Sequence, residues 1–342
     1  MTPLPCVVCV PAKDEAAAVP RLLRALAAQR AAGPDRPLRV LLLANNCTDA
    51  TAAVARATAH PALDLRVQEA RLLGNEAHVG FARRQALALG LDWLRRDGEP
   101  EGALISTDAD ALPPPDWIGA QLRALAEGAD CVGGRIDLDD SLPLPPGLLA
   151  VRDTVARYWA AVRALADRID PLPWDPAPRH GDHVAGSLAI AAPFYEAIGG
   201  LPPLPCGEDN ALVAEVERAG GRLRHDPAVF VRVSAREDGR ASGGMATEMV
   251  KWRRIAETGA PHLLPDAAFW QALLQRRADL RALFHARRLE GEMAALAAGC
   301  PNDIAFLARA EPLLPALPQA EAPIATATTA LEALARDGRI AA

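Results

Sequence analysis

Short apolar runs alternate with stretches of helical periodicity over the first 140 residues of the chain. The apolar runs have lengths typical of buried strands and cover residues 4–10, 38–44, 63–68, 103–106 and 131–136. Between them, apolar residues recur at the spacing of one helix face within residues 17–29, 50–58, 81–95 and 120–126. Strands and helices that alternate in this way predict an α/β fold with a mainly parallel sheet covered on both faces.

The alternation becomes irregular beyond residue 140, where proline-rich connections interrupt it. Helical patterns at residues 148–165 and 210–219 still alternate with strand-like runs at 184–191 and 229–233. From residue 246 to about 310 the pattern is helical throughout. The chain is therefore predicted to add a helical C-terminal extension to the α/β domain.

Composition narrows the class of protein. The net charge of −6 argues against a nucleic-acid-binding protein, which usually shows a basic face. No apolar run reaches the roughly 18 to 20 residues of a transmembrane helix, and the start of the chain lacks the pattern of a signal peptide. The six cysteines are scattered, as in a reduced protein. We expect a cytoplasmic protein without a transmembrane segment, and peripheral contact with a membrane stays open.

Two aspartates directly follow the apolar run at residues 103–106. Asp108 and Asp110 stand one residue apart, at a strand end, where open α/β sheets bind their ligands. Carboxylates are hard oxygen ligands that suit Mg²⁺ or Mn²⁺, and such a cation suits a diphosphate. The alternative interpretation is a solvated turn in which Asp108 or Asp116 caps a helix.

Polar segments stand in a fixed order at the other strand and helix ends. They are Pro11-Ala12-Lys13-Asp14-Glu15, Asn45-Asn46-Cys47-Thr48-Asp49, Gly80-Phe81-Ala82-Arg83-Arg84, Gly186-Ser187 and Gly207-Glu208-Asp209-Asn210. Together with Asp108-Ala109-Asp110, this series closely resembles the family 2 glycosyltransferases of the GT-A fold. The resemblance covers about residues 5–244. Each motif is weak alone, and their shared order makes the match strong.

The resemblance implies a nucleotide-diphospho-sugar-dependent, inverting transferase of the hexosyltransferase type that uses Mg²⁺ or Mn²⁺. Asp110 would ligate the metal, and Asp108 would contact the metal or the ribose. The other donor-binding residues that it implies are Pro11, Ala12, Glu15, Asn45, Asp49 and Arg83. Ala44 or Asn45 replaces the acidic residue that the family usually has near the end of the second strand, so a carboxylate contact to the base is in doubt.

Inverting transfer needs a base that deprotonates the acceptor hydroxyl on the face opposite the leaving group. By resemblance we assign this role to Asp209, with Glu208 as a neighbour that positions or binds the acceptor. The alternative is that both acids simply begin a helix, where negative charge is favoured.

Further residues are candidates for binding phosphate or acceptor. Gly186 and Ser187 form the glycine segment of the family, with Ser187 where Asn is frequent. Arg236 and Arg240 lie in a Gly-rich stretch and could clamp a diphosphate or an anionic acceptor, or could belong to a surface turn. Trp252 faintly matches the Q-x-x-R-W motif of polymerising relatives, and a place in the core is equally consistent.

The pattern and the resemblance together predict three parts of the chain. Residues 1–244 form a GT-A domain, with a nucleotide-binding part to about 137 and an acceptor part over about 138–244. Residues 245–310 form the helical extension, and 311–342 a Pro/Ala linker with a short terminal helix. Two other functions stay open: a nucleotidylyltransferase of related fold and a catalytically silent nucleotide-sugar-binding protein. The sugar, the base, the acceptor and the oligomeric state have no readable signal.

Overall fold

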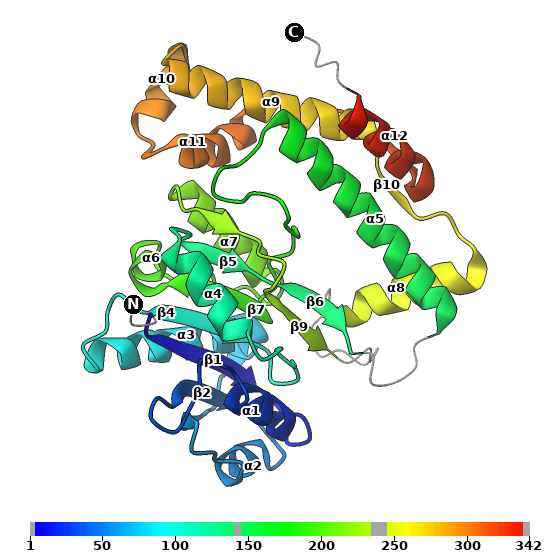
Figure 1. Ribbon diagram of the computed structural model, residues 1–342. Coiled ribbons are helices and arrows are strands. Elements are labelled where there is room, and N and C mark those ends of the chain that lie inside the picture. The colour runs from blue at the N-terminus through cyan, green and yellow to red at the C-terminus, as the bar shows by residue number, and fades with distance from the viewer. Residues whose placement is uncertain (1–3, 140–144, 234–244, 338–342) are drawn as a thin grey trace. The chain divides into compact units, whose positions relative to one another are not determined.

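The computed structural model describes residues 4–139, 145–233 and 245–337, with the backbone alone for 245 and 246, and divides into two compact units (Figure 1). Unit 1 comprises residues 1–139, 182–217 and 221–234, and unit 2 comprises 140–181, 218–220 and 235–342. The expected acceptor part, 138–244, is thus divided between the two units. Among the described residues, no helix combines the length and the apolar character that crossing a bilayer requires.

Unit 1 is built on a seven-stranded sheet in the order β3-β2-β1-β4-β7-β5-β8. Its strands are β1 (Cys6–Ala12), β2 (Leu38–Asn45), β3 (Leu63–Ala70), β4 (Ala103–Thr107), β5 (Cys131–Gly133), β7 (Ser187–Ala191) and β8 (Leu223–Arg224). Only β7 runs antiparallel to its neighbours, β4 and β5. The predicted α/β class with a mainly parallel sheet is confirmed.

Helices connect these strands. They are α1 (Val19–Ala27), α2 (Thr51–Ala57), α3 (Val79–Arg96), α4 (Trp117–Ala126), α6 (Ala192–Ala197) and α7 (Glu208–Arg218), with a short 3₁₀ turn η1 (Gly74–Glu76). One buried cluster packs α3 on β1 and β4 and includes Ala86, Leu87 and Leu94 together with Cys9 and Leu104. Gly90 permits this close approach, because a Cβ there would lie 2.5 Å from the Cys9 sulfur.

The run expected as one strand over residues 131–136 is two strands, and the expectation was wrong. After β5, Gly134 passes so close to β7 that a Cβ would lie 1.9 Å from Ser187 Oγ. The chain then leaves the main sheet as β6 (Arg135–Leu138) and pairs in parallel with β9 (Phe230–Val233). A glycine at a close backbone approach is therefore the point at which the strand changes sheet.

Unit 2 is mainly helical. It contains α5 (Pro146–Ile169), α8 (Met245–Thr258), α9 (Ala267–Ala286), α10 (Gly291–Ala298), α11 (Asp303–Ala310), η2 (Glu311–Leu313) and α12 (Ile324–Arg336). Two short antiparallel strands, β10 (Leu263–Pro265) and β11 (Glu321–Pro323), tie the extension together. Tyr158 and Leu165 of α5 share one buried cluster with Leu274 of α9 and Leu331 of α12. Residues 140–181 are thus an insertion within unit 1, and their helix α5 packs with the C-terminal helices α9 and α12.

Candidate active site

The predicted donor-side segments meet at one edge of the sheet. Strands β2, β1 and β4 are adjacent and parallel, so their carboxyl ends, with Asn45, Ala12 and Asp108, lie at the same edge. The antiparallel strand β7 brings its first residue there, since Ser187 pairs with Thr107. This is the edge at which open α/β sheets bind ligands.

Arg83 of α3 joins the aspartate that follows β4 to the acid that begins α7. Its Nη2 donates to Asp108 Oδ1 at 2.7 Å, and its Nε donates to Glu208 Oε1 at 3.2 Å. The side chains of Arg83 and Glu208 are only 4% and 8% exposed, whereas that of Asp108 is 36% exposed. Burial disfavours the charged guanidinium, but the two carboxylates outweigh it and raise the pKa of Arg83 above its ordinary value.

The peptide groups at Ala185 extend this network to Asp209. The Ala185 carbonyl accepts from Arg83 Nη1 at 3.2 Å and from Ser106 Oγ at 2.8 Å. The Ala185 N–H donates to Asp209 Oδ2 at 3.0 Å, and the Asn210 N–H donates to Asp209 Oδ1 at 2.8 Å. The structure therefore brings Asp108, Arg83, Glu208 and Asp209 into one hydrogen-bonded group.

The two aspartates after β4 fit a hard divalent cation. Both are partly exposed, and their carboxylate oxygens are ligands that Mg²⁺ and Mn²⁺ prefer. Asp108 Oδ1 is engaged by Arg83, while a Cβ at Gly186 would lie 2.6 Å from Asp108 Oδ2. Only glycine leaves room beside that second oxygen. The donor set suits a cation held by Asp110 and Asp108 together with oxygens of a diphosphate.

Ser187 has a structural partner in addition to its place at the edge. Its Oγ accepts from the indole Nε1 of Trp117 at 2.9 Å, and both residues are completely buried. The carbonyl of Gly186 accepts from Thr107 Oγ1 at 2.9 Å. The serine that replaces the family's frequent asparagine therefore anchors α4 to the start of β7.

A second acidic group lies at the ends of β1 and β2, where Asp14, Cys47 and Asp49 offer ligand atoms within 4.8 Å of one another. Asp14 Oδ1 accepts from the N–H groups of Thr48 at 2.6 Å and Asp49 at 3.3 Å. The hydrogen bond from the Thr48 N–H is the main reason why the pKa of Asp14 lies below its usual range. Cys47 is a soft ligand and donates its thiol to the Ala12 carbonyl at 3.4 Å.

These bonds identify the group as a clamp between two loops. Asp49 Oδ2 accepts from the Ala16 N–H at 3.0 Å, and the Glu15 N–H donates to Thr51 Oγ1 at 2.8 Å. Asp49, predicted beside the base, thus fastens the loop that carries Glu15. Glu15 is half-buried, whereas Pro11, Ala12 and Asn45 are buried. The clamp thus fixes the loop after β1 against the loop after β2.

Residues 7–146 match the family model described as Glycosyl transferase family 2. These residues form a family 2 glycosyltransferase domain. Its mainly parallel sheet, with the motifs at the carboxyl edge, is the GT-A fold that the sequence predicts. No match was found among curated proteins.

Several solved structures resemble this chain at low identity. The mannosyltransferase of Pyrobaculum calidifontis, in complex with GDP-Man and Mn²⁺, has 20% identity and a TM-score of 0.49, over 98% of this chain and 85% of that one. TarS 1–349 of S. aureus has 14% identity and a TM-score of 0.45, over 99% and 93%. The M. tuberculosis glucosyl-3-phosphoglycerate synthase, with Mn²⁺, UDP and phosphoglyceric acid, has 16% identity and a TM-score of 0.43, over 77% and 83%.

Three predicted residues lie outside the described part of unit 1. Arg236 and Arg240 lie outside the described residues. Trp252 is half-buried on α8 of unit 2, and its indole Nε1 is buried with no hydrogen-bond partner among the described residues. Their roles stay predictions.

Sequence reasoning assigned no role to Ser106 or Asp14, and it left residues 180–183 as an acceptor-side loop or as residues without a role. Ser106 could have been found, because it is a polar residue at the end of an otherwise apolar run. His183 Nε2 lies 3.0 Å from Asn210 Oδ1, and its ring centroid lies 5.8 Å from that of His225. Burial, foremost, and then His225 lower the pKa of His183. No local signal in the sequence indicates this contact.

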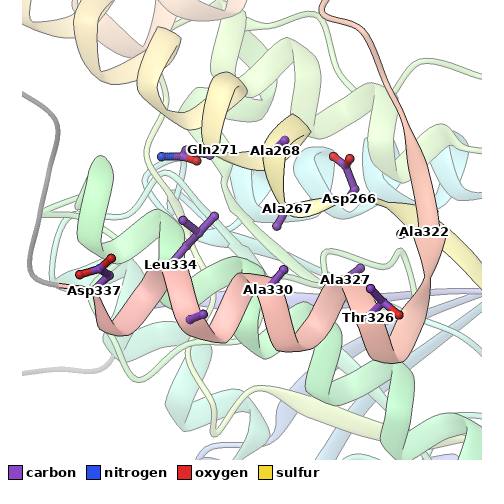
Figure 2. Close-up of a pocket in the computed structure, with 11 residues that line it drawn as sticks. Asp266, Ala267, Ala268, Gln271, Ala322, Thr326, Ala327, Ala330, Leu334 and Asp337 are labelled. Carbon is purple, nitrogen blue, oxygen red and sulfur yellow. The ribbon is translucent and has the colours of Figure 1, made fainter.

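A groove of about 570 Å³ lies in unit 2 between α9 and α12 (Figure 2). Its walls are mostly alanine side chains such as Ala267, Ala327 and Ala330, and Asp266 and Asp337 are its acidic members. None of the predicted site residues lines it. The groove therefore adds nothing to the site at the sheet edge.

Proposed function

We propose that the chain transfers a sugar from a nucleotide diphosphate donor to a hydroxyl acceptor, with inversion and with help from Mg²⁺ or Mn²⁺. The observation that carries this proposal is the network through Arg83 and Ala185, which connects Asp108 on the donor side to Asp209 on the acceptor side. A hexose donor and a cytoplasmic location belong to the same proposal.

Asp108 and Asp110 would hold the metal, with the donor's phosphates as further ligands. A bound divalent cation neutralises the negative charge that develops on the leaving diphosphate. Glu15 and the backbone at Pro11 and Ala12 would bind the nucleotide, with Asn45 next to the base. Arg236, Arg240 and Trp252 would serve the phosphates or the acceptor.

Asp209 is the better candidate for the base of the Glu208-Asp209 pair. Glu208 is buried and ion-paired to Arg83, so its carboxylate is not accessible to an acceptor hydroxyl. Asp209 is partly exposed, and one backbone N–H on each oxygen keeps its carboxylate oriented. In the proposed step, Asp209 accepts the proton of the acceptor hydroxyl as that oxygen attacks the anomeric carbon. The bond between this carbon and the diphosphate oxygen breaks, and the nucleoside diphosphate leaves with the bonding electrons.

The test begins with a thermal-shift panel of nucleotide sugars with Mn²⁺, because a donor at about 100 times its Kd adds about 2.7 kcal/mol of stability. Transfer and donor hydrolysis are then followed with the stabilising donor. Calorimetry of the matching nucleoside diphosphate with and without EDTA tests the metal. We expect EDTA and Asp110→Ala each to abolish most of the binding, since the carboxylates would otherwise repel the diphosphate.

The decisive variant is Asp209→Asn, which keeps the size of the side chain but is a far poorer proton acceptor. We expect normal donor binding and a transfer rate lower by roughly 10²–10⁴-fold. Glu215→Gln, an exposed acid on the same helix, is the matched control and should transfer normally. A near-normal rate for Asp209→Asn, or NMR evidence that the product retains the anomeric configuration, would refute the assignment. If the chain binds the donor but neither transfers nor hydrolyses its sugar, the result would favour the alternative of a catalytically silent nucleotide-sugar-binding protein.

A further inference from the structure

A glycine-bracketed segment leads directly into the Glu208-Asp209 pair. It spans residues 199–207, between α6 and α7. Gly199, Gly200 and Gly207 adopt positive φ values of 79°, 81° and 73°, a conformation that side chains rarely allow. The glycines at both ends therefore act as flexible joints of the segment. Asp209 lies two residues after Gly207, the second joint.

The first two turns of α3 contact this segment between its terminal glycines. Arg84 Nη1 donates to the Leu201 carbonyl at 2.6 Å, and Arg84 Nη2 donates to the Gly199 carbonyl at 3.2 Å. Gly80 lies directly against the segment, because a Cβ there would be 1.9 Å from the Leu204 carbonyl oxygen. Helix α3 thus contacts the segment at its start and in its middle.

Two neighbouring arginines of α3 bind opposite ends of the segment. Consecutive helix residues point about 100° apart, so Arg83 and Arg84 reach different surroundings. Arg83 binds Glu208 at the end of the segment, whereas Arg84 binds carbonyls at its start. A guanidinium suits the second task because its fixed fork presents two donors to two acceptors, which an ammonium group on a flexible stem cannot match.

We propose that Arg84 is a positioning residue that fixes the place of Asp209 by holding the 199–207 segment. Its hydrogen-bond partners among the described residues are main-chain carbonyls of that segment, and it bonds to neither Asp108 nor Asp209. Arg84 should therefore affect the transfer step and leave donor binding unchanged. The expected effect on kcat rests on the proposed function, whereas the expected hold of Arg84 on the segment does not.

The expected result is a separation of kcat from donor affinity. Arg84→Ala removes two charge-assisted hydrogen bonds and frees the segment between its glycine joints. Because a misplacement of about 1 Å can cost about 10²-fold in rate, we expect kcat to fall by about 10- to 100-fold, with donor Kd within about twofold of the wild type. Arg84→Lys can hold one carbonyl and should give an intermediate kcat.

Arg95→Ala is the matched control. Arg95 lies on the same helix, is 42% exposed and pairs with Glu196 of α6, shortly before the segment. Its removal should leave kcat and the amide exchange of residues 199–207 unchanged. Comparison of the two variants separates the hold on the segment from any general effect of removing an arginine from α3.

Hydrogen–deuterium exchange tests the proposal without any transfer assay. Peptides from residues 199–207 should exchange faster in Arg84→Ala than in the wild type, while peptides from β1 and β4 stay unchanged. Unchanged exchange in the segment, kcat within about twofold of the wild type, or a donor Kd that rises in parallel with the loss of kcat would overturn the proposal. If Arg84→Ala does not fold, the same measurements on Arg84→Lys decide. A wild-type chain without transfer would refute the proposed function and leave the exchange result valid.

Discussion

Arg83 has an almost completely buried guanidinium group that is bonded to two carboxylates and two neutral oxygens. Taking such a cation out of water is costly, and its surroundings compensate through charge and hydrogen bonds. The planar fork serves Asp108 and Glu208 from separate nitrogens, which a lysine could not do. A single side chain thus fixes the relative positions of three segments that are distant in the sequence.

The first prediction at this scale concerns the stability that Arg83 provides. Arg83→Met would leave the buried Glu208 carboxylate without its partner, so we expect a loss of about 3–5 kcal/mol in the free energy of unfolding. Adding Glu208→Gln removes the unpaired charge and should restore part of the lost free energy of unfolding. Urea unfolding of both single variants and the double variant measures this coupling.

The control is Arg123→Met, which breaks an exposed ion pair with Asp116 whose side chains are 57% and 36% exposed. Such a pair should contribute no more than about 1 kcal/mol. A loss below about 1 kcal/mol for Arg83→Met would contradict the role that we assign to its buried ion pairs.

At the scale of elements, the sequence predicted what depends on local pattern. Alternating apolar runs and helical periodicity placed β1 to β4 and the helices between them, because each strand and helix carries its own periodicity. The strand order also brought Asp108 to the edge where the first two strands end. The switch from β5 to β6 at Gly134 was missed, since its cause is a close approach to Ser187, which is distant in the sequence.

For the candidate site, the residue types could likewise be predicted from the sequence, whereas the contacts between them could not. The types and order of Asp108, Glu208 and Asp209 were visible in the motifs. That Arg83 reaches both Asp108 and Glu208, and that the Ala185 peptide links Ser106 to Asp209, depends on tertiary contacts. A motif gives residue types at strand ends, and only the folded sheet decides which of them touch.

At the scale of elements, the prediction concerns the contact between the segment before β7 and the start of α7. The folded state lowers the pKa of His183 below the ordinary value of about 6.5, chiefly by burial and then through His225, despite the Asn210 bond and the nearby Asp209. The unfolded chain therefore binds more protons as the pH falls through about 6.5, so the folded state loses stability below that pH.

We expect the urea midpoint of the wild type to fall between pH 7.5 and pH 5.5. His183→Gln should show a smaller fall, because the neutral amide cannot titrate and can still reach Asn210. His60→Gln, at an exposed site, is the matched control and should keep the full pH dependence. An unchanged pH dependence in His183→Gln would show that other groups cause the fall.

At the scale of the whole molecule, the chain builds two units with separate cores. Unit 1 holds the sheet and the candidate site, and unit 2 joins the insertion at residues 140–181 to the C-terminal helices. The amphipathic pattern of residues 148–165 predicted a helix correctly but could not show which helices cover its apolar face. That face packs with α9 and α12, about 100 or more residues further along the chain.

The last prediction tests the domain boundary at residue 244, which stays a prediction from the sequence. A chain that ends there keeps α5 but loses α9 and α12, so Tyr158, Val162 and Leu165 lose the side chains that cover them. Burying each such side chain is worth about 1.5–3 kcal/mol, so the exposed face should drive self-association. We expect the 1–244 chain to bind a hydrophobic dye and to elute as oligomers, unlike the full chain. Replacing residues 140–181 in it by a flexible Gly/Ser linker removes α5 and should restore a monomer with little dye binding. A monomeric 1–244 chain that binds no dye would show that α5 does not need the C-terminal helices, and residue 244 would then be a true boundary.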